Sequence, residues 1–245
     1  MKIFGINFNY SPSQKKPITI AICDFKKSQG LSVLKVEPIY GLKEFDTFLK
    51  QQGPWFAGVN FPLGQPNLFL KKMNLPDKWN SYIKDINRWK LDGFEKKVKQ
   101  FKAKLPNNAK EPLRLTDTMA GAESSLKFTQ KQLAKQFYEG TNCLIKSGVS
   151  ILPCNPKKDT RVVLETFPDL VAQRFAVHDL GARLKSVDIE SLHKEIIKGL
   201  ENENEDILVS SFKVDKVKKM LDNNVILNGL TLIALQWFFL NYYKS

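Results

Sequence analysis

The stretch WFAGVNFPLGQP at residues 55–66 decides the fold that this sequence predicts. Trp55 to Phe61 has the apolar and small residues of a buried strand, and residues 62–66 cannot continue it because two prolines lack the N–H that a sheet requires. Residues 42–49 precede it with apolar side chains at helical spacing, and Gly53-Pro54 ends that segment. A helix leading into a strand predicts a right-handed crossover, which lays the new strand parallel to an earlier one.

Three short strands are predicted before this crossover, at residues 3–8, 17–25 and 31–36. In the second, isoleucines at 18, 20 and 22 alternate with smaller or more polar residues, as in a strand with one buried face. The connections at 9–16 and 26–30 are short, which favours an antiparallel meander. The sequence therefore predicts a βββαβ beginning.

The middle of the chain predicts a basic helical insertion at about residues 67–110, with apolar stripes that include Trp79, Ile83 and Phe94. A further strand is predicted at 161–167, where Pro168 is suited to open a helix. We expect one α/β domain over residues 1–245, with a mixed five-stranded sheet and flanking helices.

Residues 225–243 are the most apolar segment, and their nineteen residues could almost cross a bilayer. Polar residues interrupt the segment, which favours a buried helix closing the core over a membrane tail anchor. The N-terminus lacks the pattern of a signal peptide, so we expect a cytoplasmic protein without membrane contact. Three cysteines without metal-ligand spacing predict free thiols in a reducing compartment.

The net charge of +13 attracts polyanions at long range, which permits contact with nucleic acid or an anionic membrane. The basic side chains on one predicted helix form either a solvated lysine face or a phosphate-contacting face; they are Lys96, Lys97, Lys99, Lys102 and Lys104.

Four sequence elements occur in an order that resembles a family of predicted ribonuclease H-like nucleases, otherwise described only as a domain of unknown function. GVNFPLGQP at 58–66 resembles that family's IDxPLGxP signature, and PLRLTD at 112–117 is similar to its Arg-x-Thr-Asp element. VVLETFPDL at 162–170 and NGLTLIALQ at 228–236 resemble its Glu-x-Tyr/Phe-Pro element and its closing DALxAxxxA helix. The resemblance implies a ribonuclease H-like fold, which agrees with the βββαβ beginning.

The resemblance also implies a metal-dependent phosphodiester hydrolysis site in which carboxylates hold divalent ions. Carboxylates suit this role because Mg²⁺ prefers anionic oxygen ligands. This sequence departs from the family at three acid positions, where Asn7, Asn60 and Asn228 stand in place of aspartate. Glu165 and Asp117 remain as matched acids. Asparagine keeps a carbonyl oxygen but gives up the negative charge, so we expect no cofactor, or Mg²⁺ or Mn²⁺ bound weakly by Glu165 and Asp117.

The interpretation that we favour is a degenerate nuclease with impaired activity that binds nucleic acid. The alternatives are an active metal-dependent nuclease that uses the remaining carboxylates and, third, a nucleotide-binding protein of the actin and sugar-kinase architecture. The absence of a GxGxxG phosphate loop places the third last. Arg114 is expected to contact either a phosphate or the Asp117 carboxylate.

Overall fold

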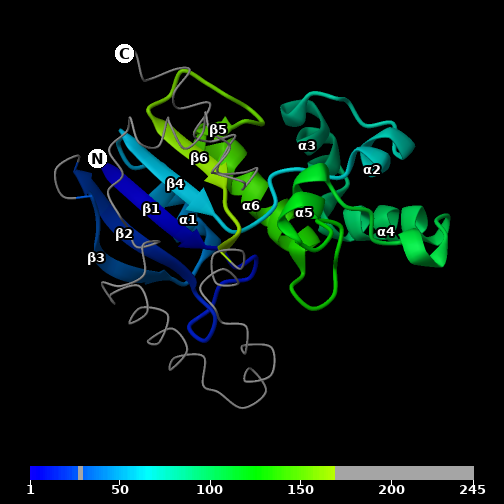
Figure 1. Cartoon of the computed structure of the whole chain (residues 1–245), viewed down its shortest axis with the longest axis horizontal. Helices are drawn as coiled ribbons and strands as arrows, with labels where there is room; N and C mark the ends of the chain where they lie inside the picture. Colours follow the sequence, from blue (N-terminus) through cyan, green and yellow to red (C-terminus); the bar gives the residue numbers. More distant parts are fainter. Residues whose placement is uncertain (27–29, 169–245) are drawn as a thin grey trace.

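The computed structural model describes residues 1–26 and 30–168 (Figure 1). In chain order the elements are β1 (Lys2–Asn7), β2 (Ile18–Lys26), β3 (Gly30–Ile39), α1 (Leu42–Leu49), β4 (Trp55–Val59), α2 (Asn67–Lys72), α3 (Trp79–Arg88), α4 (Lys90–Ala103), the 3-10 helix η1 (Asn107–Ala109), α5 (Leu115–Ala120), α6 (Leu133–Ser147), β5 (Ser150–Leu152) and β6 (Arg161–Glu165).

The strands form one mixed sheet in the order β3-β2-β1-β4-β6-β5. The first three strands are antiparallel, and β4 lies parallel to β1, as the crossover predicts. Both β6 and β5 continue the parallel half of the sheet. The predicted α/β class and βββαβ order are confirmed, but the sheet has six strands where we expected five, because β5 adds three buried residues at the edge.

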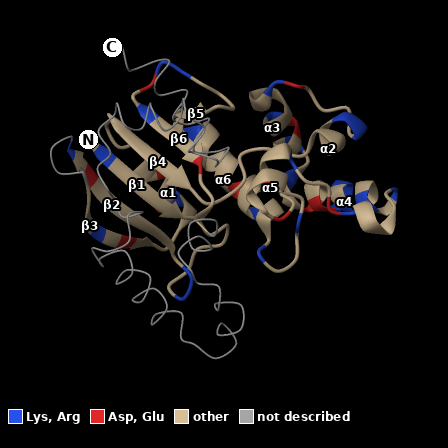
Figure 2. Ribbon diagram, in the orientation of Figure 1, with Lys and Arg blue, Asp and Glu red and all other residues tan. Residues whose placement is uncertain are grey.

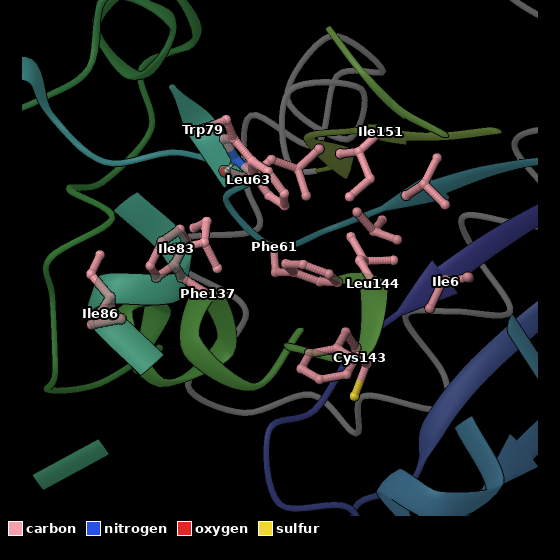
Figure 3. Close-up of a cluster of buried hydrophobic side chains, with 14 of the residues drawn as sticks. Ile6, Phe61, Leu63, Trp79, Ile83, Ile86, Phe137, Cys143, Leu144 and Ile151 are labelled. Atoms are coloured by element: carbon pink, nitrogen blue, oxygen red, sulfur yellow. Dashed lines mark hydrogen bonds between the residues drawn. The ribbon is translucent and has the colours of Figure 1, made fainter. Parts of the chain in front are cut away.

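Aromatic side chains hold α1 and α6 against one face of the sheet, behind it in Figure 1. Phe8 of the loop after β1 lies 5.3 Å from Phe45 of α1 and 4.8 Å from Phe61, measured between ring centroids. Figure 3 shows Phe61 lying between Leu144 of α6 and the insertion residues Ile83 and Ile86. These residues belong to one buried core, which joins the sheet to the helices that follow it.

The predicted insertion is helical and comprises α2, α3, α4 and η1. Its apolar stripes turn inward: Trp79, Ile83 and Ile86 of α3 are buried, and so are Phe94, Val98 and Phe101 of α4. Figure 1 shows α2 to α5 grouped to one side of the sheet, on the right of the view.

Several sequence predictions concern residues that this structure does not describe. Residues 225–243, Asn228 and the helix predicted after Pro168 lie outside the described ranges, apart from Pro168 itself. Within residues 1–26 and 30–168, no helix combines the length and apolar character that a membrane span needs. All three cysteines lie in the described part and are free thiols.

Candidate functional site

Asn7 and Asn60 meet at the carboxyl ends of two neighbouring parallel strands. Asn7 is the last residue of β1, and Asn60 directly follows β4. The Asn60 Nδ2 donates to the Asn7 Oδ1 at 2.5 Å, while the Asn60 Oδ1 accepts from the Phe8 N–H at 2.8 Å. The two positions therefore converge, and their amides are engaged with each other and with the backbone.

Glu165 ends β6 at the same edge of the sheet, but its side chain belongs to the opposite face. The register pairs Glu165 with Val59, which comes one residue before Asn60. Successive side chains of a strand point to opposite faces, so Glu165 shares the face of the buried Val59 and not that of Asn7. The positions that the family resemblance groups together therefore form two separate sets in the described part of the chain.

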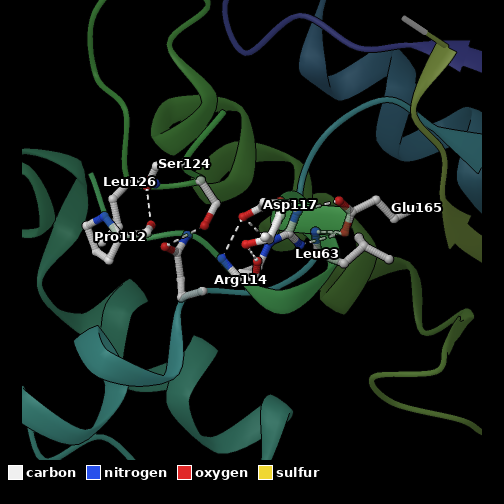
Figure 4. A network of polar contacts seen from close by, with 10 residues as sticks. Leu63, Pro112, Arg114, Asp117, Ser124, Leu126 and Glu165 are labelled. Carbon is white, nitrogen blue, oxygen red and sulfur yellow. Dashed lines mark hydrogen bonds and ion pairs between the residues drawn. The ribbon is translucent and has the colours of Figure 1, made fainter. Parts of the chain in front are cut away.

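The second set is built around Arg114, the N-cap residue of α5 (Figure 4). Its guanidinium donates to Asp117 from Nε at 3.0 Å and from Nη2 at 2.5 Å. The same group donates to Glu165 from Nη1 at 2.8 Å and from Nη2 at 2.6 Å. Asp117 is 1% exposed and Arg114 is 14% exposed, so this is a shielded triad with one cation and two anions. Of the two partners expected for Arg114, a phosphate or the Asp117 carboxylate, the structure shows the carboxylate.

Local helix geometry explains the Arg114 to Asp117 half of the triad. Asp117 stands at the third position of α5 and accepts the backbone N–H of Arg114 at 2.9 Å, as a capping-box acid does. Spacing of three residues brings the two side chains onto one side of the helix start. Glu165 comes to Arg114 from 51 residues away, and only the tertiary fold brings it there.

The triad also fixes the turn that follows β4. The Leu63 N–H donates to Glu165 Oε2 at 2.8 Å, and the Leu63 carbonyl accepts from the Trp79 indole at 2.5 Å. The apolar pattern of the sequence indicates Trp79 only as a core residue, and it predicts no role for Leu63. A proline on each side of Leu63-Gly64-Gln65 was the available signal that this backbone takes a defined turn.

Burial and charge shift the pKa values of several groups around the triad. Burial lowers the pKa of Arg114, but the hydrogen bonds to Glu165 and Asp117 outweigh it and raise the pKa above its ordinary value. Burial, with the Glu165 charge, raises the pKa of Cys154 to about 11. Tyr82 also has a raised pKa, chiefly through burial. The arginine is therefore cationic at every ordinary pH, and the neighbouring thiol and phenol are neutral.

The lysines predicted on one helix face have different surroundings along α4. Lys96 and Lys104 are exposed, and Lys99 pairs with Glu95 at 2.8 Å. Lys97 lies over the Trp89 ring, with its Nζ 4.7 Å from the ring centroid. Lys102 is only 17% exposed and its Nζ bonds to Glu111 at 2.6 Å and to the Leu126 carbonyl at 3.0 Å. The five lysines thus comprise solvated, aromatic-stacked and internally paired side chains.

Comparison of this chain with protein-family models, with curated proteins and with solved structures gives no match.

Proposed function

We propose that this protein is a catalytically impaired relative of the ribonuclease H-like nucleases that binds nucleic acid without cleaving it. The observation that carries the proposal is the division of the site into an amide pair and a neutralised acid pair. Asn7 and Asn60 hydrogen-bond each other, and the acids Glu165 and Asp117 share the Arg114 guanidinium.

The side chains of these four residues do not fit a divalent metal ion as ligands. Mg²⁺ and Mn²⁺ prefer several hard anionic oxygens that converge on one point. Here the Asn7 and Asn60 amides lie on one face of the sheet, the Glu165 carboxylate lies on the other, and Asp117 belongs to helix α5. Within the described residues, acidic, histidine and cysteine side chains form no group of three that could hold a metal. A metal at Glu165 and Asp117 would have to displace the guanidinium that compensates both charges.

Nucleic-acid binding is supported by the net charge of +13 and by the exposed lysines of α4. Lysine-rich surfaces bind phosphate backbones through counterion release, which needs no metal and no intact catalytic site. Arg114 is unsuited to this role, because two carboxylates already satisfy its guanidinium.

The test measures binding and cleavage with the same purified protein. Fluorescence anisotropy with labelled oligonucleotides should show sequence-independent binding at low ionic strength that weakens steeply as salt rises. Incubation with Mg²⁺ or Mn²⁺ should leave the oligonucleotides intact. Metal-dependent cleavage that Glu165→Gln abolishes would instead establish an active nuclease, and absence of binding at low ionic strength would refute the nucleic-acid role.

A further inference from the structure

The positive charge of this protein is concentrated in its helical insertion. Residues 67–110 contain twelve lysines and arginines against four aspartates and glutamates, a net charge of +8 within a chain whose total is +13. Figure 2 shows basic residues, coloured blue on the ribbon, along α2, α3 and α4. The rest of the chain therefore carries a net charge of only +5. The electrostatic potential that attracts a polyanion depends on where these charges lie in the protein, and not only on its total net charge.

Most of these cations point into solvent and form no ion pair with any residue that the structure describes. Arg88, Lys99 and Lys102 pair with carboxylates, and Lys97 covers the Trp89 ring. The exposed lysines of the insertion without such a pair are Lys71, Lys72, Lys78, Lys84, Lys90, Lys96, Lys104 and Lys110. Concentrating eight unpaired positive charges in one segment of the chain is unfavourable in the free protein, and a polyanion relieves that repulsion.

Trp89 adds an aromatic surface at the junction of α3 and α4. It is partly exposed, and a Cβ at Gly93, one helical turn later, would lie 3.3 Å from the Trp89 Cβ. The absence of a side chain at Gly93 avoids crowding against the Trp89 Cβ, and Lys97, one turn further along α4, lies over the Trp89 ring. An indole paired with an ammonium group suits an unpaired base and its phosphate, because the base stacks on the ring and the ammonium then moves to the phosphate.

Both ends of the insertion are tied to the edge of the sheet. It begins directly after the turn that contains Leu63, and the chain returns through Arg114, which binds Glu165. The Trp79 indole of α3 bonds the Leu63 carbonyl as well. The basic helices are thus held at the edge where the candidate site lies, and they are not attached through a free linker.

We propose that the helical insertion is a binding surface for single-stranded nucleic acid, with Trp89 as its base-stacking residue and the exposed lysines of the insertion as its phosphate contacts. This inference rests on the proposed function and assigns its contacts to the insertion. Duplex bases are stacked on one another and cannot reach the indole, so the surface should prefer single strands.

The experiment compares two variants that carry the same net charge. The insertion variant replaces Lys72, Lys84, Lys96 and Lys104 with glutamine. The matched control replaces Lys15, Lys16, Lys43 and Lys50, which are also exposed lysines but lie outside the insertion. Anisotropy titrations use a labelled oligothymidylate, a duplex of equal length and anionic phosphatidylserine vesicles, over a series of salt concentrations. Thermal melting of each variant confirms that it is folded.

We expect the insertion variant to bind the single strand on the order of tenfold more weakly than wild type, and the control to resemble wild type. The log–log salt slope should become shallower by about 0.7 for each phosphate that the variant no longer neutralises. Trp89→Leu should weaken single-strand binding about fivefold to a hundredfold and leave duplex binding unchanged.

Equal weakening in the insertion and control variants would overturn the inference while leaving the proposed function intact, because only the total charge would then matter. Duplex binding as tight as single-strand binding, or binding to vesicles alone, would also overturn it. A wild-type protein that binds no oligonucleotide would refute the proposed function itself.

Discussion

Replacing Arg114 with methionine is expected to destabilise the fold strongly, because it removes the cation that two carboxylates share. Asp117 is 1% exposed and Glu165 is 18% exposed, so neither recovers full hydration after the change. Removing one partner of a buried ion pair costs about 3–5 kcal/mol. At about 2–4 °C per kcal/mol for a chain of this size, the melting midpoint should fall by about 6–20 °C.

The assay is thermal unfolding at pH 7, followed by far-ultraviolet circular dichroism. Arg114→Lys is the matched control, because it keeps the positive charge but lacks the planar fork that binds both carboxylates. We expect its midpoint to lie between those of wild type and Arg114→Met. The double variant Arg114→Met/Glu165→Gln should regain part of the stability, since it removes one uncompensated charge. A methionine variant that melts within about 2 °C of wild type would refute the structural role of the triad.

Three further predictions concern Gly140 and the cysteines Cys143 and Cys154. Gly140→Ala should lower the free energy of unfolding by about 1–3 kcal/mol in denaturant titration, because the new Cβ would lie 2.4 Å from the buried Phe61 ring. This clash should outweigh the better helix propensity of alanine. The control Lys146→Ala, at an exposed position of the same helix, should be nearly neutral. At pH 8, Cys143 and Cys154 should react with a thiol reagent far more slowly in the native protein than in the unfolded protein. Burial raises the pKa of both thiols, that of Cys154 to about 11, so little reactive thiolate is present in the native state. Rapid labelling of the native thiols would contradict this. The free energy of unfolding should also decline as pH rises above about 8.5, the ordinary thiol pKa, because the thiols ionise at lower pH in the unfolded chain than in the native protein. Replacing both cysteines with alanine should flatten that decline.

Local patterns predicted the sheet and the insertion well. The alternation in β2 is confirmed by Ile18 and Ile20, which are almost fully buried. The crossover rule predicted that β4 would lie parallel to an earlier strand; that strand is β1, and the pairing brings Asn7 and Asn60 into contact. Each of these predictions uses either residues close in sequence or the handedness rule that applies to every strand–helix–strand unit.

β5 and α6 escaped prediction for identifiable reasons. β5 has only three residues, all of them buried, so it shows no alternation that would separate it from a loop. Helix α6 was not predicted, although Ala134, Phe137 and Leu144 form its buried side. Gly140 and Thr141 interrupt that apolar stripe. The Phe61 ring fills the space beside Gly140, and the buried Thr141 hydroxyl donates to the Phe137 carbonyl within the helix.

The site was predicted only in part, because convergence at one sheet edge does not fix the face on which a side chain emerges. The order of the strands brings Asn60 and Glu165 to the same edge, but the register separates them by one residue and hence by one face. The partnership of Arg114 with Glu165 depends on the return of the insertion to the sheet. No local pattern encodes that return.

Asparagine in place of aspartate at the sheet edge is the reason why we expect this protein not to bind divalent metal. The most direct measurement is the thermal shift that Mn²⁺ induces in wild type and in Asn7→Asp/Asn60→Asp, with Asn228→Asp added in a third protein. Wild type should melt at the same temperature with and without metal. Without metal, the two aspartate variants should melt at a lower temperature than wild type, because neighbouring carboxylates repel each other. Their free energy of unfolding should rise by about 2.7 kcal/mol when Mn²⁺ reaches a hundred times its dissociation constant, and their melting temperature should rise with it. A comparable metal-induced rise in the wild-type midpoint, accompanied by metal-dependent cleavage of oligonucleotides, would contradict the proposed impairment of the site.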